Sequence, residues 1–244
     1  MLYGTTYEGG GSGCEGHGCG TVFSVTTTGT EKVLHSFLWH SDGGYPRAAL
    51  IDVKGTLYGT TSSGGTINYG TVFSISRAGA EKVLYSFKGG YDGVAPLASL
   101  INLNGTLYGT TLGGGGFDCT GNSCGTVFSV TTTGVENVLY RFQGFSDGAF
   151  RWGGLIAVDG MLYGTTYEGG SGSGCGEQNG CGTIFSMTTS GTKNLQYSLS
   201  GGANGALPTA GLVNVRGVLY GTTAFGGESC HNHDECGTVF AFTP

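Results

Sequence analysis

The hydrophobic positions of the chain recur in two short phrases that alternate along its whole length. The first phrase reads Leu-Tyr-Gly-Thr-Thr, and its copies start 50 to 57 residues apart, at residues 2–6, 57–61, 107–111, 162–166 and 219–223. The second reads Gly-Thr-Val-Phe or Gly-Thr-Ile-Phe, at residues 20–23, 70–73, 125–128, 182–185 and 237–240. A repeat of this length without helical periodicity is typical of the blades of a β-propeller.

Two further apolar runs complete each repeat. The first alternates apolar and polar residues, which predicts a half-buried strand, at residues 32–37, 82–87, 137–142 and 194–199. The second is almost continuously apolar, which predicts a strand buried on both faces, at residues 48–53, 98–103, 153–158 and 210–215. A polar turn such as Asn104-Gly105 then leads back to the first phrase, as in a β-hairpin.

These runs predict an all-β fold, a β-propeller of about five blades, each a four-stranded antiparallel sheet. We expect one repeat domain over residues 1–244. The two phrases occur five times, but the two further apolar runs occur only four times. Either the seam blades are therefore incomplete, or the chain is part of a longer array that begins mid-repeat. An open, solenoid-like stack is the alternative. The meander places all the long loops at one end of the strands, and we predict the binding surface there.

The eight cysteines form four close pairs, each located between the two phrases of one repeat. The pairs are Cys14/Cys19, Cys119/Cys124, Cys175/Cys181 and Cys230/Cys236. The second repeat lacks both members of a pair, which favours four local disulfides over zinc binding, because these spacings are unusual for zinc. Disulfides persist in oxidising compartments, so we expect a secreted or cell-surface protein, with a signal peptide absent from this chain.

The composition excludes two classes of partner. The formal net charge is −6 with few charged residues, whereas nucleic-acid binding requires a basic face, so we expect no nucleic-acid partner. No apolar run approaches the roughly 18–20 residues of a membrane span. The 52 glycines cluster between the apolar runs, where turns require positive φ angles.

The repeat as a whole resembles a known family. The phrases Asp-Gly, Gly-x-Leu-Tyr-Gly-Thr-Thr, Gly-Gly and Gly-Thr-Val-Phe resemble the GloVer tandem repeat of bacterial extracellular proteins, the "choice-of-anchor" GloVer-containing proteins. The resemblance covers essentially the whole chain. It implies a propeller-like array that is secreted or displayed on a bacterial surface, and it supplies no reaction or catalytic residue.

One polar position repeats in the loop before the last run of each repeat. It precedes a glycine and is occupied by Asp42, Asp92, Asp147 and Asn204. Such residues stabilise turns by bonding to their own backbone. The alternative is a set of carboxylates that binds calcium or sugar hydroxyl groups.

Departures from the repeat give the remaining candidates. Five residues after the Asp stand Arg47, Leu97, Trp152 and Thr209, and Arg151 replaces a proline. An arginine there suits a carboxylate and a tryptophan suits the face of a sugar ring, so we predict ligand binding by Arg47, Arg151 and Trp152. Ordinary surface roles are the alternative.

A histidine-rich pair of loops is a second candidate metal site, besides the repeated carboxylates that could hold calcium. If the first and last blades are neighbours, His17 approaches His231, His233 and Asp234, and these suit a transition metal. Solvated loop tips are the alternative, and we expect no other cofactor.

The sequence contains no familiar catalytic pattern. We therefore expect a non-catalytic module that binds a glycan or an extracellular protein. A propeller-type glycoside hydrolase that uses Asp and Glu residues of the same end is the alternative, and the sequence leaves open whether the protein is an enzyme.

Overall fold

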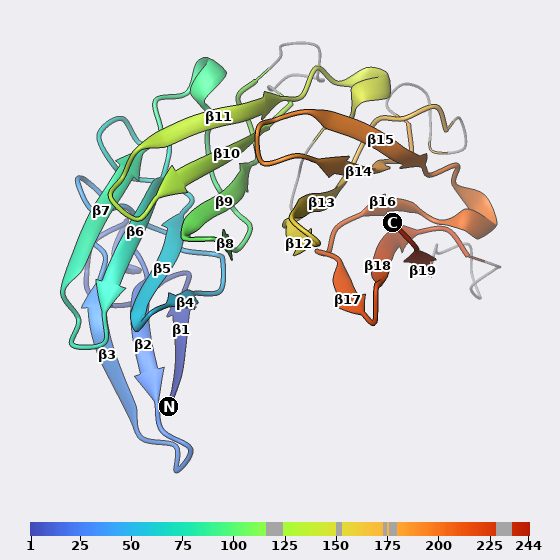
Figure 1. Cartoon of the computed structure of the whole chain (residues 1–244). Helices are drawn as coiled ribbons and strands as arrows, with labels where there is room; N and C mark the ends of the chain where they lie inside the picture. Colours follow the sequence, from blue (N-terminus) through green and yellow to red (C-terminus); the bar gives the residue numbers. More distant parts are fainter. Residues whose placement is uncertain (116–123, 150–152, 173–174, 176–179, 228–235) are drawn as a thin grey trace. The chain divides into compact units, whose positions relative to one another are not determined.

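The computed structural model describes residues 1–115, 124–149, 153–172, 175, 180–227 and 236–244 (Figure 1). The chain divides into two compact units. Unit 1 comprises Met1–Thr111 and Phe128–Asn137, and unit 2 comprises Leu112–Val127 and Val138–Pro244. The prediction of a single domain over residues 1–244 stays a prediction.

The described residues form five antiparallel sheets in succession. The first sheet contains β1 (Leu2–Thr6), β2 (Thr21–Val25) and β3 (Glu31–Ser36). The second contains β4 (Ile51–Val53), β5 (Thr56–Thr61), β6 (Thr71–Ser76) and β7 (Glu81–Ser86). The third contains β8 (Ile101–Leu103), β9 (Thr106–Thr111), β10 (Thr126–Thr131) and β11 (Glu136–Arg141). The fourth contains β12 (Ile156–Val158), β13 (Met161–Thr166), β14 (Thr183–Met187) and β15 (Lys193–Ser198). The fifth contains β16 (Ala206–Pro208), β17 (Val213–Val215), β18 (Val218–Phe225) and β19 (Val239–Phe242).

The four predicted runs correspond to strands of these sheets, and β16 is an additional strand that was not predicted. The predicted all-β architecture is confirmed. Within the described ranges, three short 3-10 helices lie in the loops that carry the repeated Asp or Asn: η1 (Gly90–Asp92), η2 (Phe145–Asp147) and η3 (Gly202–Asn204). These helices were not predicted. None of the described helices has the length and apolar character that a membrane crossing requires.

The last run of each repeat differs from the prediction. Only its final three residues form a strand, and β4, β8 and β12 have one hydrogen-bonded neighbour each. The side chains of these edge strands are mostly half-buried, and those of β17 are exposed. The expectation of a strand buried on both faces is therefore wrong.

A β-bulge interrupts the predicted alternation in β3. The register pairs Val22 with His35 and Phe23 with Val33, so Leu34 is the extra residue. A bulge rotates the side chains that precede it. Leu34 consequently packs against the hydrophobic core of unit 1, while Val33 is 49% exposed. The same irregularity occurs between β6 and β7 and between β14 and β15.

The glycine of the first phrase makes room for the phenylalanine of the second. Gly59 lies directly opposite Phe73 in the register, and a β-carbon on Gly59 would lie 2.6 Å from the tip of that ring. The ring of Phe73 also meets Phe37 of the first sheet edge-on, with 5.2 Å between the ring centres. Both side chains are almost fully buried, and burial of each contributes about 1.5–3 kcal/mol. The repeated Gly and Phe therefore hold neighbouring sheets together within unit 1.

The same contact recurs elsewhere within each unit. Phe87 meets Phe128 at 5.0 Å in unit 1, and Phe142 meets Phe185 at 5.6 Å in unit 2.

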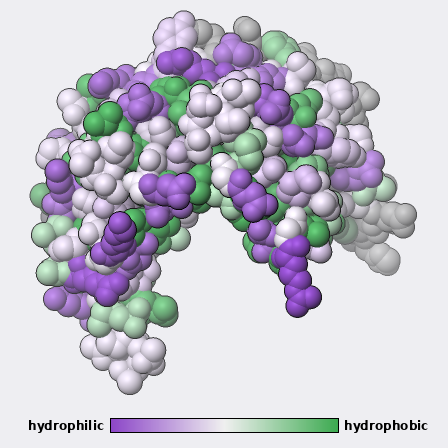
Figure 2. All heavy atoms as spheres, viewed as in Figure 1, coloured by the Kyte–Doolittle hydropathy of each residue, from purple (hydrophilic) through white to green (hydrophobic). Residues whose placement is uncertain are grey.

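Hydrophobic and hydrophilic residues are interspersed over the coloured part of the face drawn in Figure 2.

The first and fifth sheets have uncovered edges in the part of the chain that the structure describes. The valine of the second phrase is fully buried at Val22 and Val72, but Val239 is 76% exposed because no described strand pairs with the outer edge of β19. In the first sheet, no described strand pairs with the free edge of β1, and Leu2 is 67% exposed. The first sheet thus contains three described strands and the fifth contains four, and the choice between incomplete seam blades and a longer array stays a prediction.

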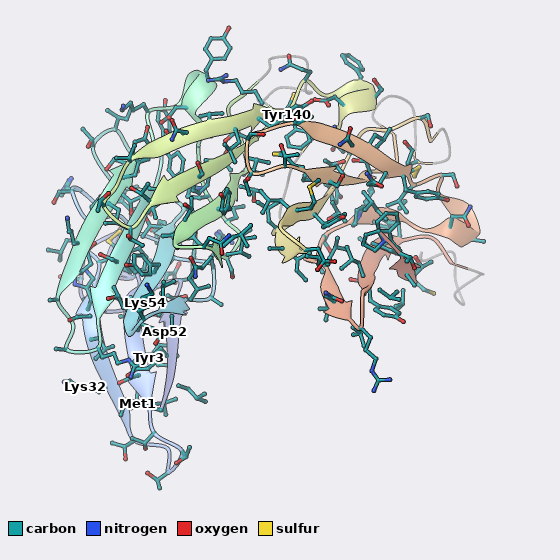
Figure 3. The ribbon with its side chains drawn as sticks, viewed as in Figure 1. Met1, Tyr3, Lys32, Asp52, Lys54 and Tyr140 are labelled. Carbon is teal, nitrogen blue, oxygen red and sulfur yellow. A yellow bond between two sulfur atoms is a disulfide. The ribbon has the colours of Figure 1, made fainter. Side chains whose placement is uncertain are left out.

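The short turns lie at the end of the strands opposite the long loops. In unit 1 this end carries Tyr3 and Asp52, which are labelled in Figure 3. The guanidinium of Arg77 donates a hydrogen bond to Asp52 at 2.6 Å. This exposed ion pair holds the pKa of Asp52 below its usual value, chiefly through that hydrogen bond.

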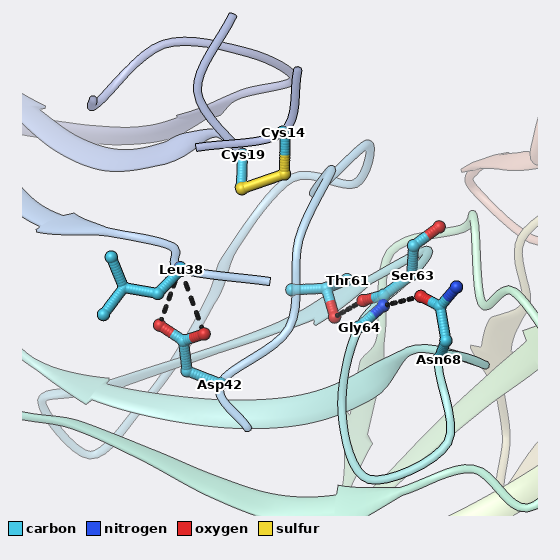
Figure 4. The surroundings of a disulfide bond; sticks show 8 residues. All are labelled: Cys14, Cys19, Leu38, Asp42, Thr61, Ser63, Gly64 and Asn68. Atoms are coloured by element: carbon cyan, nitrogen blue, oxygen red, sulfur yellow. Dashed lines mark hydrogen bonds between the residues drawn. A yellow bond between two sulfur atoms is a disulfide. The ribbon is translucent and has the colours of Figure 1, made fainter. Parts of the chain in front are cut away.

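The threonines of the two phrases close the base of the long loop. Thr71 and Thr61 share a hydrogen bond of 2.8 Å between their hydroxyl groups, and the Thr71 amide donates to the Thr61 hydroxyl at 3.1 Å. Thr61 donates in turn to the carbonyl of Ser63 (Figure 4). The hydroxyl pair recurs at the same distance in Thr6/Thr21, Thr166/Thr183 and Thr223/Thr238. We call this arrangement the threonine clamp.

Candidate functional site

Disulfides pin the long loops just beyond the threonine clamp. Cys14 is bonded to Cys19 (Figure 4), and Cys175 is bonded to Cys181, as predicted. Cys124 and Cys236 are also disulfide-bonded. Their predicted partners, Cys119 and Cys230, lie outside the described residues.

The repeated Asp residues fold their own loops. Both carboxylate oxygens of Asp42 accept the Leu38 amide at 3.1 Å (Figure 4), and Nε2 of His35 lies 3.2 Å from Oδ2. Asp92 accepts the Lys88 amide at 2.6 Å and the Tyr85 hydroxyl at 2.7 Å. This geometry is the one that the turn interpretation requires.

Unit 2 repeats the arrangement. Asp147 accepts the Gln143 amide at 2.8 Å and the Tyr140 hydroxyl at 2.6 Å. Burial and the hydrogen bond to Asp147 raise the pKa of Tyr140 far above its usual value. Asn204 instead donates to the hydroxyl of Ser200 at 2.9 Å.

The residue that begins the fourth, outer strand of a sheet approaches the Asp loop of the preceding sheet in the same unit. Nζ of Lys193 donates to Oδ1 of Asp147 at 2.7 Å and lies 5.1 Å from the centre of the Phe142 ring. Glu81 occupies the same position at the start of β7, close to His35, and burial raises its pKa to about 7. Neither Glu81 nor Lys193 was predicted from the sequence. The only sign of their role in the sequence is that this position changes between Glu and Lys among the repeats.

Four residues of the first repeat form a cluster at the long-loop end of unit 1, which we call the aromatic group. It consists of Tyr7, Trp39, Tyr45 and Arg47. Tyr7 and Tyr45 stack with 4.6 Å between ring centres, and Trp39 meets Tyr45 edge-on at 5.0 Å. The guanidinium carbon of Arg47 lies 4.2 Å from the centre of the Tyr7 ring. The second repeat has no aromatic counterpart, since it carries Ser62, Gly89, Ala95 and Leu97 at these positions.

The backbone of Trp39 adopts a conformation that the other repeats reserve for glycine. Its φ angle is +78°, whereas the corresponding Gly89, Gly144 and Gly201 have φ angles of +75°, +79° and +75°. A non-glycine residue in this region costs about 1–2 kcal/mol. Packing of the Trp39 ring against a core that includes Cys19 offsets part of that cost.

Two glutamates of the first long loop contribute to the electrostatic environment of Tyr45. The pKa of Tyr45 is raised, first by the neighbours that exclude water from it and then by Tyr7, Glu15 and Glu8. Both glutamates are exposed, as is Arg47. The long-loop end of unit 1 therefore carries the aromatic group and the exposed side chains of Glu8 and Glu15.

Among the predicted ligand-binding residues, the structure places Arg47 in the aromatic group and Asp42 in the same loop, between β3 and β4. Asp92 lies in the corresponding loop of the next sheet of unit 1, and Asp147 and Asn204 lie in unit 2. Arg151, Trp152, His231, His233 and Asp234 lie outside the described residues.

The metal prediction consequently stays a prediction. His17 is exposed within the first disulfide loop, where its carbonyl accepts the Gly9 amide at 2.8 Å. Within the described ranges, no three His, Cys, Asp or Glu side chains are grouped so as to hold a metal ion.

Comparisons with known proteins support the fold. A candidate gluconolactonase of known structure is 14% identical and aligns with 90% of this chain and 70% of its own, with a TM-score of 0.52. An α-L-arabinofuranosidase from Lactobacillus brevis is 11% identical over 93% of this chain and 83% of its own, with a TM-score of 0.47. At these identities only the architecture is comparable, and the predicted β-propeller fold is confirmed.

The sequence comparison is more specific. No curated protein matches the chain. The profile of the Gloeobacter/Verrucomicrobia repeat matches residues 1–177 and 121–244, which together span the chain. The protein therefore belongs to the Gloeobacter/Verrucomicrobia repeat family, the family that its repeated phrases resemble.

Proposed function

We propose that the chain is a non-catalytic, glycan-binding module of an extracellular repeat protein and that it binds its ligand at the long-loop end of unit 1. The observation that carries this proposal is Trp39, which is held at φ +78° where the other repeats have glycine. Strained residues persist where the surrounding structure or a function retains them, and they concentrate at ligand sites. The disulfides support an extracellular location, since such bonds survive in oxidising compartments.

The repeated carboxylates favour binding over hydrolysis. A glycoside hydrolase requires a general acid and a second carboxylate that both face the substrate, about 5–10 Å apart. Asp42, Asp92 and Asp147 instead accept amide hydrogen bonds from their own loops. The hydroxyl groups of Tyr85 and Tyr140 donate additional hydrogen bonds to Asp92 and Asp147, respectively. Their role is therefore to position loops, and a hydrolytic function is the alternative that the experiment below tests.

The test is a glycan array combined with a hydrolysis assay on the oxidised protein and two variants. Trp39→Gly restores the residue that the other repeats use, so the loop keeps its backbone conformation while the ring is lost. Leu38→Ala is the matched control, because Leu38 is 73% exposed and lies outside the aromatic group. We expect glycan binding by the parent and the control, at least tenfold weaker binding by Trp39→Gly, and circular dichroism spectra that agree for all three.

Three results would overturn the proposal. Hydrolysis of a bound glycan by the parent would make the protein an enzyme. Equal glycan binding by the parent and Trp39→Gly, or an absence of glycan binding by the parent, would remove the ligand site from the aromatic group.

A further inference from the structure

The outer edge of β19 borders an open groove in unit 2. The groove has a volume of about 370 Å³, and its lining includes the side chains of Tyr197, Leu199 and Phe240. Asn204 of η3 and Val239 of β19 line it as well. β19 pairs with β18 on one side, and no described strand pairs with it on the other. The backbone groups of β19 that face this side are therefore available to a further strand.

The other sheets show which element occupies the equivalent position. In each of them the strand of the second phrase pairs with an outer strand, as β14 does with β15. The Leu199 amide, just after β15, donates to the carbonyl of Gly182, the first residue of that phrase, at 2.9 Å. The same bond joins Phe37 to Gly20, Phe87 to Gly70 and Phe142 to Gly125. Gly237 is the counterpart in the fifth sheet, and no described residue donates to its carbonyl.

The side chains of β19 are less buried than those of the equivalent strand β14. Val239 is 76% exposed, whereas Ile184 at the same register position is 2% exposed. Phe240 is half-buried, whereas Phe185 is fully buried. A strand added to β19 would cover this apolar surface and pair its backbone groups, which are the two contributions that drive β-strand addition.

The neighbouring interface of unit 2 shows where the first residue of an outer strand goes. Nζ of Lys193, which begins β15, lies 5.3 Å from the centre of the Tyr140 ring and 6.0 Å from that of the Phe185 ring. It also donates to Oδ1 of Asp147 at 2.7 Å. The groove contains the equivalents of these three neighbours, which are Tyr197, Phe240 and Asn204.

Asn204 distinguishes a basic from an acidic residue at that point. Its amide nitrogen donates to the Ser200 hydroxyl at 2.9 Å, and its Oδ1 accepts from no described residue. An ammonium group can donate to Oδ1 and lie over the faces of aromatic rings, whereas a carboxylate can do neither. A strand that begins with lysine, as β15 does, therefore fits the groove better than one that begins with glutamate, as β7 does.

We infer that the outer edge of β19 and the groove beside it bind an extended strand of another polypeptide, one that begins with lysine and then alternates polar and apolar residues as β15 does. The added strand pairs with β19, donates an amide to the Gly237 carbonyl and places its lysine beside Asn204. This inference is independent of the proposed function, because the aromatic group belongs to unit 1 and the groove to unit 2.

The experiment is fluorescence anisotropy with the full chain and three labelled peptides. The first peptide has the sequence of residues 191–200. The second carries glutamate in place of its lysine. The third carries an N-methyl group on the leucine that corresponds to Leu199, which removes the donor to Gly237. We expect the first peptide to bind about tenfold more tightly than either of the others, a difference of about 1.4 kcal/mol.

Asn204→Lys supplies an opposite signature, because it places a cation where the peptide lysine would lie. This variant should prefer the glutamate peptide over the lysine peptide. Asn194→Lys is the matched control, since Asn194 is an exposed residue of β15 that does not line the groove and the change in net charge is the same. The control should keep the preference of the parent.

Equal binding of the three peptides, or an Asn204→Lys variant that keeps the preference of the parent, would overturn the inference. Sedimentation velocity of the chain alone interprets an absence of peptide binding. A dimer that binds no peptide would assign the edge of β19 to a second copy of the chain, and a monomer that binds no peptide would show that the edge takes no strand. Both results would overturn the inference and leave the proposed function untouched.

Discussion

Replacement of Glu81 by glutamine should raise the free energy of unfolding above pH 7 and leave it unchanged at pH 4. Burial raises the pKa of this carboxyl group from 4.5 to about 7. One of its oxygens, Oε1, is buried without a hydrogen-bond partner. The native protein therefore holds the Glu81 proton more tightly than the unfolded chain does. Stability is greatest below about pH 4.5, declines as the pH rises, and has lost the whole contribution above about pH 7.

The size of this stability difference follows from the change in the pKa of Glu81. A difference of about 2.5 pKa units corresponds to about 3.4 kcal/mol at 1.36 kcal/mol per unit. Glu81 is only half-buried, and solvent screening reduces this figure to about 1–2 kcal/mol. Glutamine keeps the size of the side chain and carries no charge at any pH. The free energy of unfolding of the Glu81→Gln variant should thus exceed that of the parent by about 1–2 kcal/mol at pH 8.

Urea unfolding of the oxidised protein at pH 4, 6 and 8 measures this difference. Glu31→Gln is the matched control, because Glu31 begins β3 as Glu81 begins β7 but is exposed. The groups near Glu81 are His35 and Asp42, and both are present in every variant, so the difference between variant and parent isolates Glu81. A gain of equal size at pH 4 and pH 8, or a loss at pH 8, would refute the reasoning.

Three further predictions concern stability. Lys193→Met should lower the free energy of unfolding by about 1–3 kcal/mol at pH 7, because Asp147 loses two hydrogen bonds from a buried ammonium group. The same urea titration at pH 3 should show a smaller loss. A loss that does not depend on pH would argue against the ion pair. Gly59→Ala should cost at least about 2 kcal/mol, seen as a lower midpoint of thermal unfolding, because its β-carbon would lie 2.6 Å from a phenylalanine ring; an unchanged midpoint would contradict the packing. Replacing Cys14 and Cys19 together by serine should cost about 2 kcal/mol in urea unfolding, since the disulfide closes a short loop; a loss that persists when both proteins are reduced would have another cause.

The fold was predictable from the sequence because each repeated residue has a local partner. Gly59 faces Phe73, and Thr61 bonds to Thr71, so the pattern that defines the repeat is the pattern of contacts within each sheet. The bulge at Leu34 was not predictable in this way. Strict alternation assumes one residue for each step of the register, and a bulge inserts an extra residue without changing the apolar character of the run.

The candidate site was predictable only in part. Arg47 was predicted because it departs from the repeat. Asp42 was predicted because it occupies a repeated turn position. Trp39 was missed, although a tryptophan in place of glycine is visible in the sequence, because its meaning depends on a φ angle of +78°. Tyr7 lies 38 residues earlier than Tyr45, and only the folded loops bring the two rings together. Glu81 approaches another sheet, a contact that no local pattern encodes.

The threonine clamp has a consequence for how such proteins diversify. Its hydroxyl pairs join residues that are 15, 10, 17 and 15 positions apart in the sequence, yet the distance between the two oxygens is 2.8 Å in every case. The geometry at the base of these four long loops is thus independent of the length of the loop. Natural variation, or a combinatorial library, can insert, delete and exchange residues beyond the clamp while the framework beneath stays constant. Antibodies separate hypervariable segments from a fixed scaffold in a comparable way.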